Sequence, residues 1–353
     1  MAETGTNIGT DAGTKTGAPS DRRIRIRVLD RVAGPEADLA QLRTSLLRPL
    51  REIPSRFFYD EVGGRLFDEI CKLPEYYLYR AEREILSRES RRIVRLAGAE
   101  ELVELGSGAS TKTRFLLDAM SREDLLKRYV PMDVNQALVR RVAGELVSLY
   151  DGLAVHGIIG DFQRGLDALP SGRRRLTAFL GGTIGNLLPA EAEDFLRRVA
   201  SKLSPGDGFL LGIDLVKDPA RLRAAYNDSR GVTERFNKNI LKVVNRLAAS
   251  DFDPSSFDHV AFYDEERRWI EMRLRTRIGR PVVLGRLAME IHLAAGEEIR
   301  TEISRKFRRA DVESLFSRTG FELADWWTDS EGLFALSLAR RAGRAPGPEP
   351  LDP

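Results

Sequence analysis

The stretch VELGSGASTKT, residues 103–113, decides the fold of this 353-residue chain. Residues 101–108 have the pattern of a short apolar strand that breaks at Gly106 and Gly108, and a segment with helical spacing, 111–120, follows. Glycines at such a turn allow a tight backbone path and a close approach by a ligand, and the helix N-terminus offers free N–H groups. A plain turn between a strand and a helix has the same pattern, so the motif alone does not establish a binding site.

The same alternation of strands and helices continues along the chain. Apolar strand-like runs are found at 129–134, 153–162, 176–186 and 208–216, and helical patterns at 81–98, 137–150, 190–203 and 310–321. Apolar strands that alternate with helices are typical of a parallel sheet covered on both faces. The run 325–341 has the pattern of a closing hairpin.

A different pattern interrupts this alternation after Lys217. Residues 219–250 are helical in spacing, and the runs 260–279 and 281–293 alternate as in a half-exposed antiparallel sheet. We therefore predict an insertion between the fifth strand and the last helix, on the side of the substrate. The Gly- and Thr-rich segment 1–22 is expected to be disordered, and the Pro-rich end, 342–353, to be a flexible tail.

Composition excludes several classes of protein. The chain carries 56 Lys and Arg against 53 Asp and Glu, a balance that argues against a nucleic-acid binder. The single cysteine, Cys71, permits no intrachain disulfide, and His156, His259 and His292 lie too far apart for metal-ligand spacing, so no metal is expected. No long apolar run and no secretory signal are evident, which predicts a cytoplasmic protein without a membrane partner.

Acidic residues follow the strands after the glycine turn. Asp133 ends the next strand, where a carboxylate can accept hydrogen bonds from both ribose hydroxyls. Asp161 follows the strand after that; it can accept from an adenine amino group, and the backbone N–H of Phe162 can donate to a ring nitrogen. Each aspartate alone could be a loop or cap residue, but in this order they favour an adenosine ligand. The third glycine of a dinucleotide fingerprint is absent, since Gly108 is followed by Ala109, Ser110 and Thr111, which disfavours NAD and leaves S-adenosylmethionine (SAM) as the natural candidate.

Several longer motifs carry a more specific resemblance. They include FFYDEVGGRLFDEICKLPEYY (57–77), FLGGTIGN (179–186), AYNDSRGVTERFNKNIL (225–241) and GEEIRTEISRKF (296–307). These closely resemble the histidine Nα-methyltransferase family of ergothioneine biosynthesis, over roughly residues 35–341. The resemblance implies trimethylation of the α-amine of L-histidine to hercynine with SAM as methyl donor.

The resemblance also implies a fold. It predicts an α/β class I SAM-dependent methyltransferase, a Rossmann-like parallel sheet with an antiparallel last strand, plus a second α+β substrate domain. We assign 79–216 with 306–341 to the methyltransferase domain, and 33–78 with 217–305 to the substrate-binding domain. A monomer is expected.

Site residues follow from the matching motifs. The resemblance implies cofactor binding by Tyr59, Gly106, Lys112, Asp133, Asp161 and Phe162, with Lys112, on the helix after the glycine turn, meeting the methionine carboxylate. Tyr59 and the Gly181 carbonyl would orient the amine as catalytic groups. The substrate-binding set would be Tyr76, Asn186, Tyr226, Met272, Glu302 and Ser304. Of these, Asn186 and Tyr226 would hold the α-carboxylate, and the others would surround the imidazole.

The spacing of Glu302 and Ser304 suits two ligands of one ring, because residues i and i+2 of a strand face the same side. A carboxylate and a hydroxyl can serve both imidazole nitrogens, whereas an indole has one N–H and no basic nitrogen. Leu78-Tyr79 in place of the usual Pro-Thr, and Gly182 in place of Ser, depart from the family pattern. Open alternatives are a methyltransferase for another aromatic amino acid or biogenic amine, and a SAM-sensing module without turnover. A nucleic-acid methyltransferase is disfavoured because the Asn186 motif lacks an aromatic residue.

Overall fold

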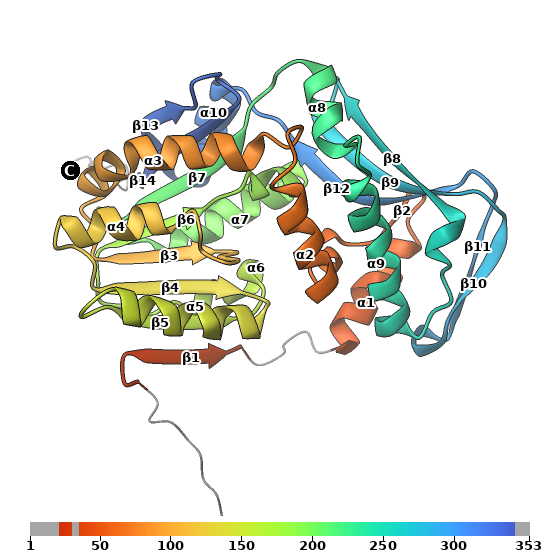
Figure 1. Ribbon diagram of the computed structural model, residues 1–353, viewed down its shortest axis with the longest axis horizontal. Helices are drawn as coiled ribbons and strands as arrows, with labels where there is room; N and C mark the ends of the chain where they lie inside the picture. Colours follow the sequence, from red (N-terminus) through yellow and green to blue (C-terminus); the bar gives the residue numbers. More distant parts are fainter. Residues whose placement is uncertain (1–20, 30–34, 343–353) are drawn as a thin grey trace, which may run out of the picture.

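The computed structural model describes residues 21–29 and 35–342. Its main feature is an eight-stranded sheet. In spatial order the strands are β1 (Ile24–Val28), β5 (Ala154–Ile159), β4 (Arg128–Asp133), β3 (Glu101–Leu105), β6 (Arg175–Phe179), β7 (Gly208–Asp214), β14 (Phe334–Arg341) and β13 (Phe321–Thr328). Strands β1, β4 and β3 run across Figure 1 with helices alongside them. Neighbours from β1 to β7 are parallel, and β14 runs antiparallel to both β7 and β13. The predicted parallel sheet with an antiparallel last strand is confirmed.

Helices cover both faces of this sheet, as the fully buried strands β3 and β7 require. One apolar core lies under α3 (Leu78–Ala97), α4 (Arg114–Arg122) and α5 (Gln136–Leu149). A second core lies under α6 (Phe162–Gly165), α7 (Pro189–Lys202) and α10 (Arg309–Thr319). The sheet is thus a rigid platform whose carboxyl edge is left free for a site.

The remaining elements gather beside that carboxyl edge (Figure 1). They are α1 (Pro35–Leu46), α2 (Glu61–Ile70), α8 (Pro219–Tyr226), α9 (Val232–Ala248), a sheet in the order β2 (Arg51–Glu52), β12 (Glu298–Arg305), β9 (Trp269–Thr276), β8 (Phe257–Asp264), and a separate hairpin of β10 (Arg280–Leu284) and β11 (Met289–Leu293). This second sheet is antiparallel apart from the short β2. Its position opposite the carboxyl ends of β3, β4 and β5 places a site between the two sheets.

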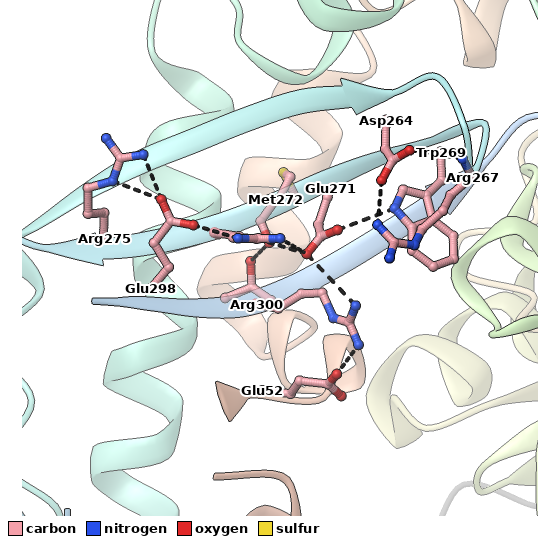
Figure 2. A network of polar contacts seen from close by, with 11 residues as sticks. Glu52, Asp264, Arg267, Trp269, Glu271, Met272, Arg275, Glu298 and Arg300 are labelled. Atoms are coloured by element: carbon pink, nitrogen blue, oxygen red, sulfur yellow. Dashed lines mark hydrogen bonds and ion pairs between the residues drawn. The ribbon is translucent and has the colours of Figure 1, made fainter. Parts of the chain in front are cut away.

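A ladder of charged side chains covers the outer face of the second sheet (Figure 2). Glu271, only 2% exposed, accepts hydrogen bonds from Trp269 at 3.2 Å and from Arg273 at 2.8 Å. Arg273 also reaches Glu298 at 2.7 Å, so it joins β9 to β12. Met272 lies between these residues in sequence and therefore points to the opposite, inner face. The ladder holds together the two strands that carry inner-face site residues.

A β-bulge determines which face of the sheet the site residues of β12 point to. In the pairing with β9, Arg300 lies opposite Arg273 on the outer face, yet Glu302 lies opposite Met272 on the inner face, because the register shifts between them. Without the shift, Arg300 and Glu302 would share a face. The bulge is thus what turns Glu302 and Ser304 inward, and strict alternation along the sequence does not predict it.

Several elements differ from the sequence prediction. Strand β1 and helix α2 were not predicted, and the helical run 219–250 is two helices. Asp228 causes that break, since its carboxylate accepts from the backbone N–H groups of Val232 and Thr233 at 2.9 and 2.7 Å and starts α9. The runs 260–279 and 281–293 each span two strands. The tails predicted at 1–22 and 342–353 lie outside the described residues except for their innermost positions, and the domain boundaries stay a prediction.

Within 21–29 and 35–342, no helix combines the length and apolar character needed to cross a membrane.

Candidate active site

A cavity of about 1420 Å³ opens at the carboxyl edge of the main sheet, between it and the second sheet. This volume exceeds the roughly 300–1,000 Å³ of a site for one drug-sized ligand, so a nucleoside and an amino acid fit together. Every site residue predicted from the sequence lines it: Tyr59, Tyr76, Gly106, Lys112, Asp133, Asp161, Phe162, Gly181, Asn186, Tyr226, Met272, Glu302 and Ser304. The fold therefore brings the two predicted half-sites into one space.

The glycine turn has the backbone shape that its sequence requires. Gly106 and Gly108 have φ of 72° and 50°, in the left-handed region that glycine adopts without strain. Ser110 also has a positive φ, 52°, and its hydroxyl lies 2.7 Å from the Tyr129 hydroxyl. This contact holds the serine in its positive-φ conformation, so the turn stays compact without a third glycine.

Asp133 stands at the end of β4 as predicted. One carboxylate oxygen accepts from the backbone N–H of Gly108 at 2.8 Å, and the other accepts from that of Asn135 at 2.9 Å. These bonds fix the carboxylate beside the glycine turn and leave further lone pairs on both oxygens for ribose hydroxyls.

Asp161 and Phe162 begin α6 after β5. Asp161 accepts from the backbone N–H of Gln163 at 2.8 Å, which makes it the N-cap of the helix. The Phe162 ring packs in the core, 5.0 Å from the ring of Phe179, so its side chain is structural. Its backbone N–H lies in the first turn of the helix, where it is free for a ligand. With Asp133, these groups fit the adenosine portion of SAM.

Lys112 differs in detail from the prediction. It lies in the turn before α4, which begins at Arg114, and it forms an ion pair with Glu82 of α3, whose side chain is completely buried. Burial alone would lower the pKa of Lys112, but the pairing with Glu82 raises it above its ordinary value. The side chain remains 18% exposed and lines the cavity, so a charged ammonium is available there for the SAM carboxylate.

Glu82 is a site residue that the sequence analysis missed. Besides Lys112, it accepts from the backbone N–H of Gly181 at 2.7 Å. Gly181 and Gly182 both have positive φ, 78° and 71°, so glycine in place of the usual serine at 182 suits this backbone. Glu82 thereby links the predicted cofactor lysine to the predicted catalytic turn.

Glu104, in the strand before the glycine turn, is only 4% exposed and accepts hydrogen bonds from Thr113 and Tyr129. Burial raises its pKa to about 7 in spite of these bonds. Through its hydrogen bonds to Thr113 and Tyr129, Glu104 stabilises the glycine turn.

We expect the raised pKa of Glu104 to appear in the pH dependence of stability. The folded chain holds this proton more tightly than the unfolded chain does, so the associated stability is present below pH 4.5 and is lost as pH rises through about 7. In Glu104→Gln this loss is absent. The unfolding free energy of the variant relative to the wild type should rise by about 2 kcal/mol between pH 5 and pH 8. Urea titrations at the two pH values measure it, and a difference that is independent of pH would contradict the assignment.

The two sheets are joined inside the cavity by one hydrogen bond. Asn186, in the loop after β6, donates from Nδ2 to Glu302 Oε1 of β12 at 2.9 Å. Burial raises the pKa of Glu302 to about 7. The second carboxylate oxygen has no other protein partner among the described residues, so it is available to a ligand.

Behind Glu302 lies a buried polar cluster. The Tyr226 hydroxyl, at the end of α8, is 2.7 Å from Ser304 Oγ. Lys306 donates to Ser304 at 2.7 Å and to Tyr226 at 3.1 Å. The family resemblance implied Tyr226 and Ser304 but not Lys306, and the sequence pattern did not point to Lys306 because a lysine after a strand is usually exposed.

Aromatic and apolar groups complete the wall of the cavity. Tyr59 is 44% exposed and lines the cavity, with its ring 5.8 Å from that of Phe67. Tyr76 is 9% exposed and packs edge-on against Tyr226, and Met272 is 1% exposed. Tyr79, one of the departures from the family pattern, lies under Lys112, whose ammonium is 5.4 Å from the ring centroid.

His259 has a structural role outside this set. Its Nε2 donates to the Tyr226 carbonyl at 2.9 Å, while Nδ1 accepts from Asn237 at 2.8 Å. Both ring nitrogens are therefore used in the neutral form, and burial lowers the pKa of this imidazole. Over the part of the chain that the structure describes, no cluster of three or more His, Cys, Asp or Glu is placed to hold a metal ion.

Comparisons with known proteins agree with this geometry. A family model described as "Histidine-specific methyltransferase, SAM-dependent" matches residues 38–341. Histidine N-alpha-methyltransferase of Mycolicibacterium smegmatis is 46% identical over 87% of this chain and 95% of its own length, and that of Mycobacterium tuberculosis is 43% identical over 90% and 100%. An L-tryptophan methyltransferase of Psilocybe serbica is 26% identical over 91% of this chain and 99% of its own length. Since the family model covers nearly all of the described residues, the chain belongs to the SAM-dependent, histidine-specific methyltransferases.

Proposed function

We propose that this enzyme transfers methyl groups from SAM to the α-amine of L-histidine until the trimethylated product, hercynine, is formed, as in ergothioneine biosynthesis. The observation that carries the proposal is the Asn186–Glu302 bond of 2.9 Å. It joins a loop of the main sheet to the second sheet inside the cavity that also contains the glycine turn. An amino acid bound beside Asn186 and Glu302 would therefore share the cavity with the adenosine and lie on the other side of the carboxyl edge of the main sheet.

The chemistry of the cavity wall supports histidine as the acceptor. The free oxygen of Glu302 can accept an imidazole N–H, and Ser304, two residues along the same strand, can serve the second nitrogen. Tyr226 and the second N–H of Asn186 can donate to an α-carboxylate. Met272 and Tyr76 supply apolar surface for a flat ring. The family and its mycobacterial relatives support the same substrate.

SAM supplies a methyl group on a positively charged sulfur, which is electrophilic without further activation. The residues of this chain then have to hold a neutral amine in line with that group. Because Glu82 fixes the N–H of Gly181, the Gly181 carbonyl is held in place to accept from the amine. A modest fall in the pKa of the amine exposes its lone pair, so no strong base is required. Tyr59, which lines the cavity, would orient the amine as methyl groups accumulate.

The proposal includes a monomeric, cytoplasmic enzyme that acts on two small molecules without a metal, a nucleic acid or a membrane as partner. The near-balance of charge and the scattered histidines support it. It also keeps the division into a methyltransferase domain, 79–216 with 306–341, and a substrate domain, 33–78 with 217–305. The cavity between the two sheets supports this division.

A panel of acceptors tests the proposal against its alternatives. With SAM present, kcat/KM should be at least about 10²-fold higher for histidine than for tryptophan or tyrosine, because a site built to bond two ring nitrogens leaves buried polar groups unpaired with the wrong ring. Release of S-adenosylhomocysteine measures all three on one scale. Equal rates with tryptophan would favour the broader aromatic acceptor. SAM binding without turnover of any amine would favour a sensing module.

A further inference from the structure

Lys306 is a buried cation at the base of the cavity to which the proposed function assigns no role. Its side chain is 0% exposed, and its ammonium lies 2.8 Å from Asp214 Oδ2. The other two contacts are those to Ser304, at 2.7 Å, and to Tyr226, at 3.1 Å. An ammonium has three N–H donors, so all of them are engaged. Lys306 therefore cannot bind a ligand itself and acts only through these partners.

Two buried lysines share one carboxylate in the cluster around Lys306. Asp214, 1% exposed, is shared between Lys306 and Lys217, which is 7% exposed and also donates to the Tyr77 hydroxyl at 2.8 Å. Two lysines thus share one carboxylate as their direct ionic partner, while Glu302 acts on Lys306 and Asp329 on Lys217 from farther away. A buried cation is stabilised by an anion that lies near it. Tyr226 and Ser304 are the parts of this cluster that line the cavity, so a carboxylate bound at Tyr226 would lie near the charge of Lys306.

The hydroxyl groups of Tyr226 and Ser304 have two hydrogens between them, and their contacts show how these are used. Tyr226 and Ser304 each accept from Lys306, and the 2.7 Å contact between them uses one of their two hydrogens. One hydroxyl hydrogen is left to point into the cavity. When a carboxylate takes it from Tyr226, Ser304 must donate to Tyr226, and Ser304 can then serve the ring only through its remaining lone pair, as an acceptor from a ring N–H. Lys306 supports this arrangement because a cation that donates to a hydroxyl oxygen strengthens the bond that the same hydroxyl donates.

We propose that Lys306 is a positioning residue that makes this site select acceptors with a free α-carboxylate over the corresponding decarboxylated amines. It acts through the Tyr226 hydroxyl and through the positive charge that it adds behind it. The inference rests on the proposed function, since it takes Tyr226 as the ligand of the α-carboxylate. It deepens that proposal, because it names the feature that separates amino acids from biogenic amines as substrates.

The test compares histidine with histamine, which keeps the ring and the amine but lacks the carboxylate. Lys306→Met should raise KM for histidine by about 10–100-fold, the range for loss of a hydrogen bond supported by a charge, and change the inhibition constant of histamine by less than about threefold. Asp214 keeps Lys217 as a partner in this variant. Lys306→Gln, which keeps donors but no charge, should fall between Lys306→Met and the wild type, and it serves if the methionine variant does not fold.

Lys217→Met is the matched control, because it removes a buried lysine from the same aspartate without touching Tyr226 or Ser304. It should keep the preference for histidine over histamine within about threefold of the wild type. In a Tyr226→Phe background, Lys306→Met should no longer alter the histidine KM by more than about threefold, since the path for its effect is absent. These two results separate an effect through the hydroxyl from a general loss of structure.

The inference is overturned if Lys306→Met weakens histidine and histamine equally, or if Lys217→Met abolishes the preference to the same extent. Either result would occur with a wild-type enzyme that still methylates histidine, so the proposed function would stand. A wild-type enzyme that does not methylate histidine would instead refute the proposed function.

Discussion

Replacement of Glu302 by alanine should lower kcat/KM for histidine by about 10²–10³-fold, while the affinity for SAM stays within about twofold. Glu302 offers a free carboxylate oxygen to the imidazole, and its other oxygen holds Asn186 at 2.9 Å. Removal of the carboxylate leaves a ring N–H unpaired in a closed site and releases the amide that serves the α-carboxylate. A lost bond to a charged group together with an unpaired buried donor costs about 3–4 kcal/mol.

Glu302→Gln is the control for this prediction. Its amide oxygen can still accept one hydrogen bond but carries no charge, so its kcat/KM should fall between those of the wild type and Glu302→Ala. Initial rates and a SAM titration on the same preparations measure both properties. A folded Glu302→Ala enzyme with wild-type kcat/KM for histidine would remove Glu302 from the proposed role.

Replacement of Asp133 by alanine should weaken SAM binding by about 10²-fold or more. The carboxylate is held by the backbone N–H groups of Gly108 and Asn135 and has lone pairs left for ribose hydroxyls. Two bonds to a charged acceptor are worth about 1.5–3 kcal/mol each, and the glycine turn also loses its anchor at Gly108. Calorimetric titration with SAM or S-adenosylhomocysteine measures the loss.

Asp133→Asn supplies the matching control. It keeps one side-chain oxygen as an acceptor and removes the charge, so its SAM affinity should lie between the wild type and Asp133→Ala. Thermal unfolding without ligand shows whether the variants keep the fold. An unchanged SAM affinity in folded Asp133→Ala would mean that the adenosine does not bind at the end of β4.

The cofactor half of the site was predictable because it follows from strand order alone. Gly106, Asp133 and Asp161 come at the carboxyl ends of β3, β4 and β5, and parallel neighbours must bring those ends to one edge. Once the strands are recognised in the sequence, the positions of these three residues follow. The substrate half came from family resemblance, since Tyr76 and Glu302 lie far apart along the chain and no local pattern brings them together.

What the sequence did not reveal depends on tertiary contacts. The β-bulge that turns Glu302 inward lies at Thr301 and has no marker in the sequence, because the residues before and after it alternate normally. Strand β1, IRIRV, alternates apolar and basic residues as a strand does, and its place at the edge of the sheet comes from pairing with β5. Glu82 is a charged residue on a helix and Lys306 one beside a strand, and their burial depends on tertiary partners that include Lys112 for Glu82 and Asp214 for Lys306.

The mass and fragmentation of the product formed from SAM and L-histidine are the most direct test of methyl transfer to the α-amine. We expect a product heavier than histidine by three methyl groups, all of them on the α-nitrogen, with an unmodified imidazole ring. A product methylated on the ring would contradict it, and so would the absence of any methylated histidine while the enzyme turns over another amine.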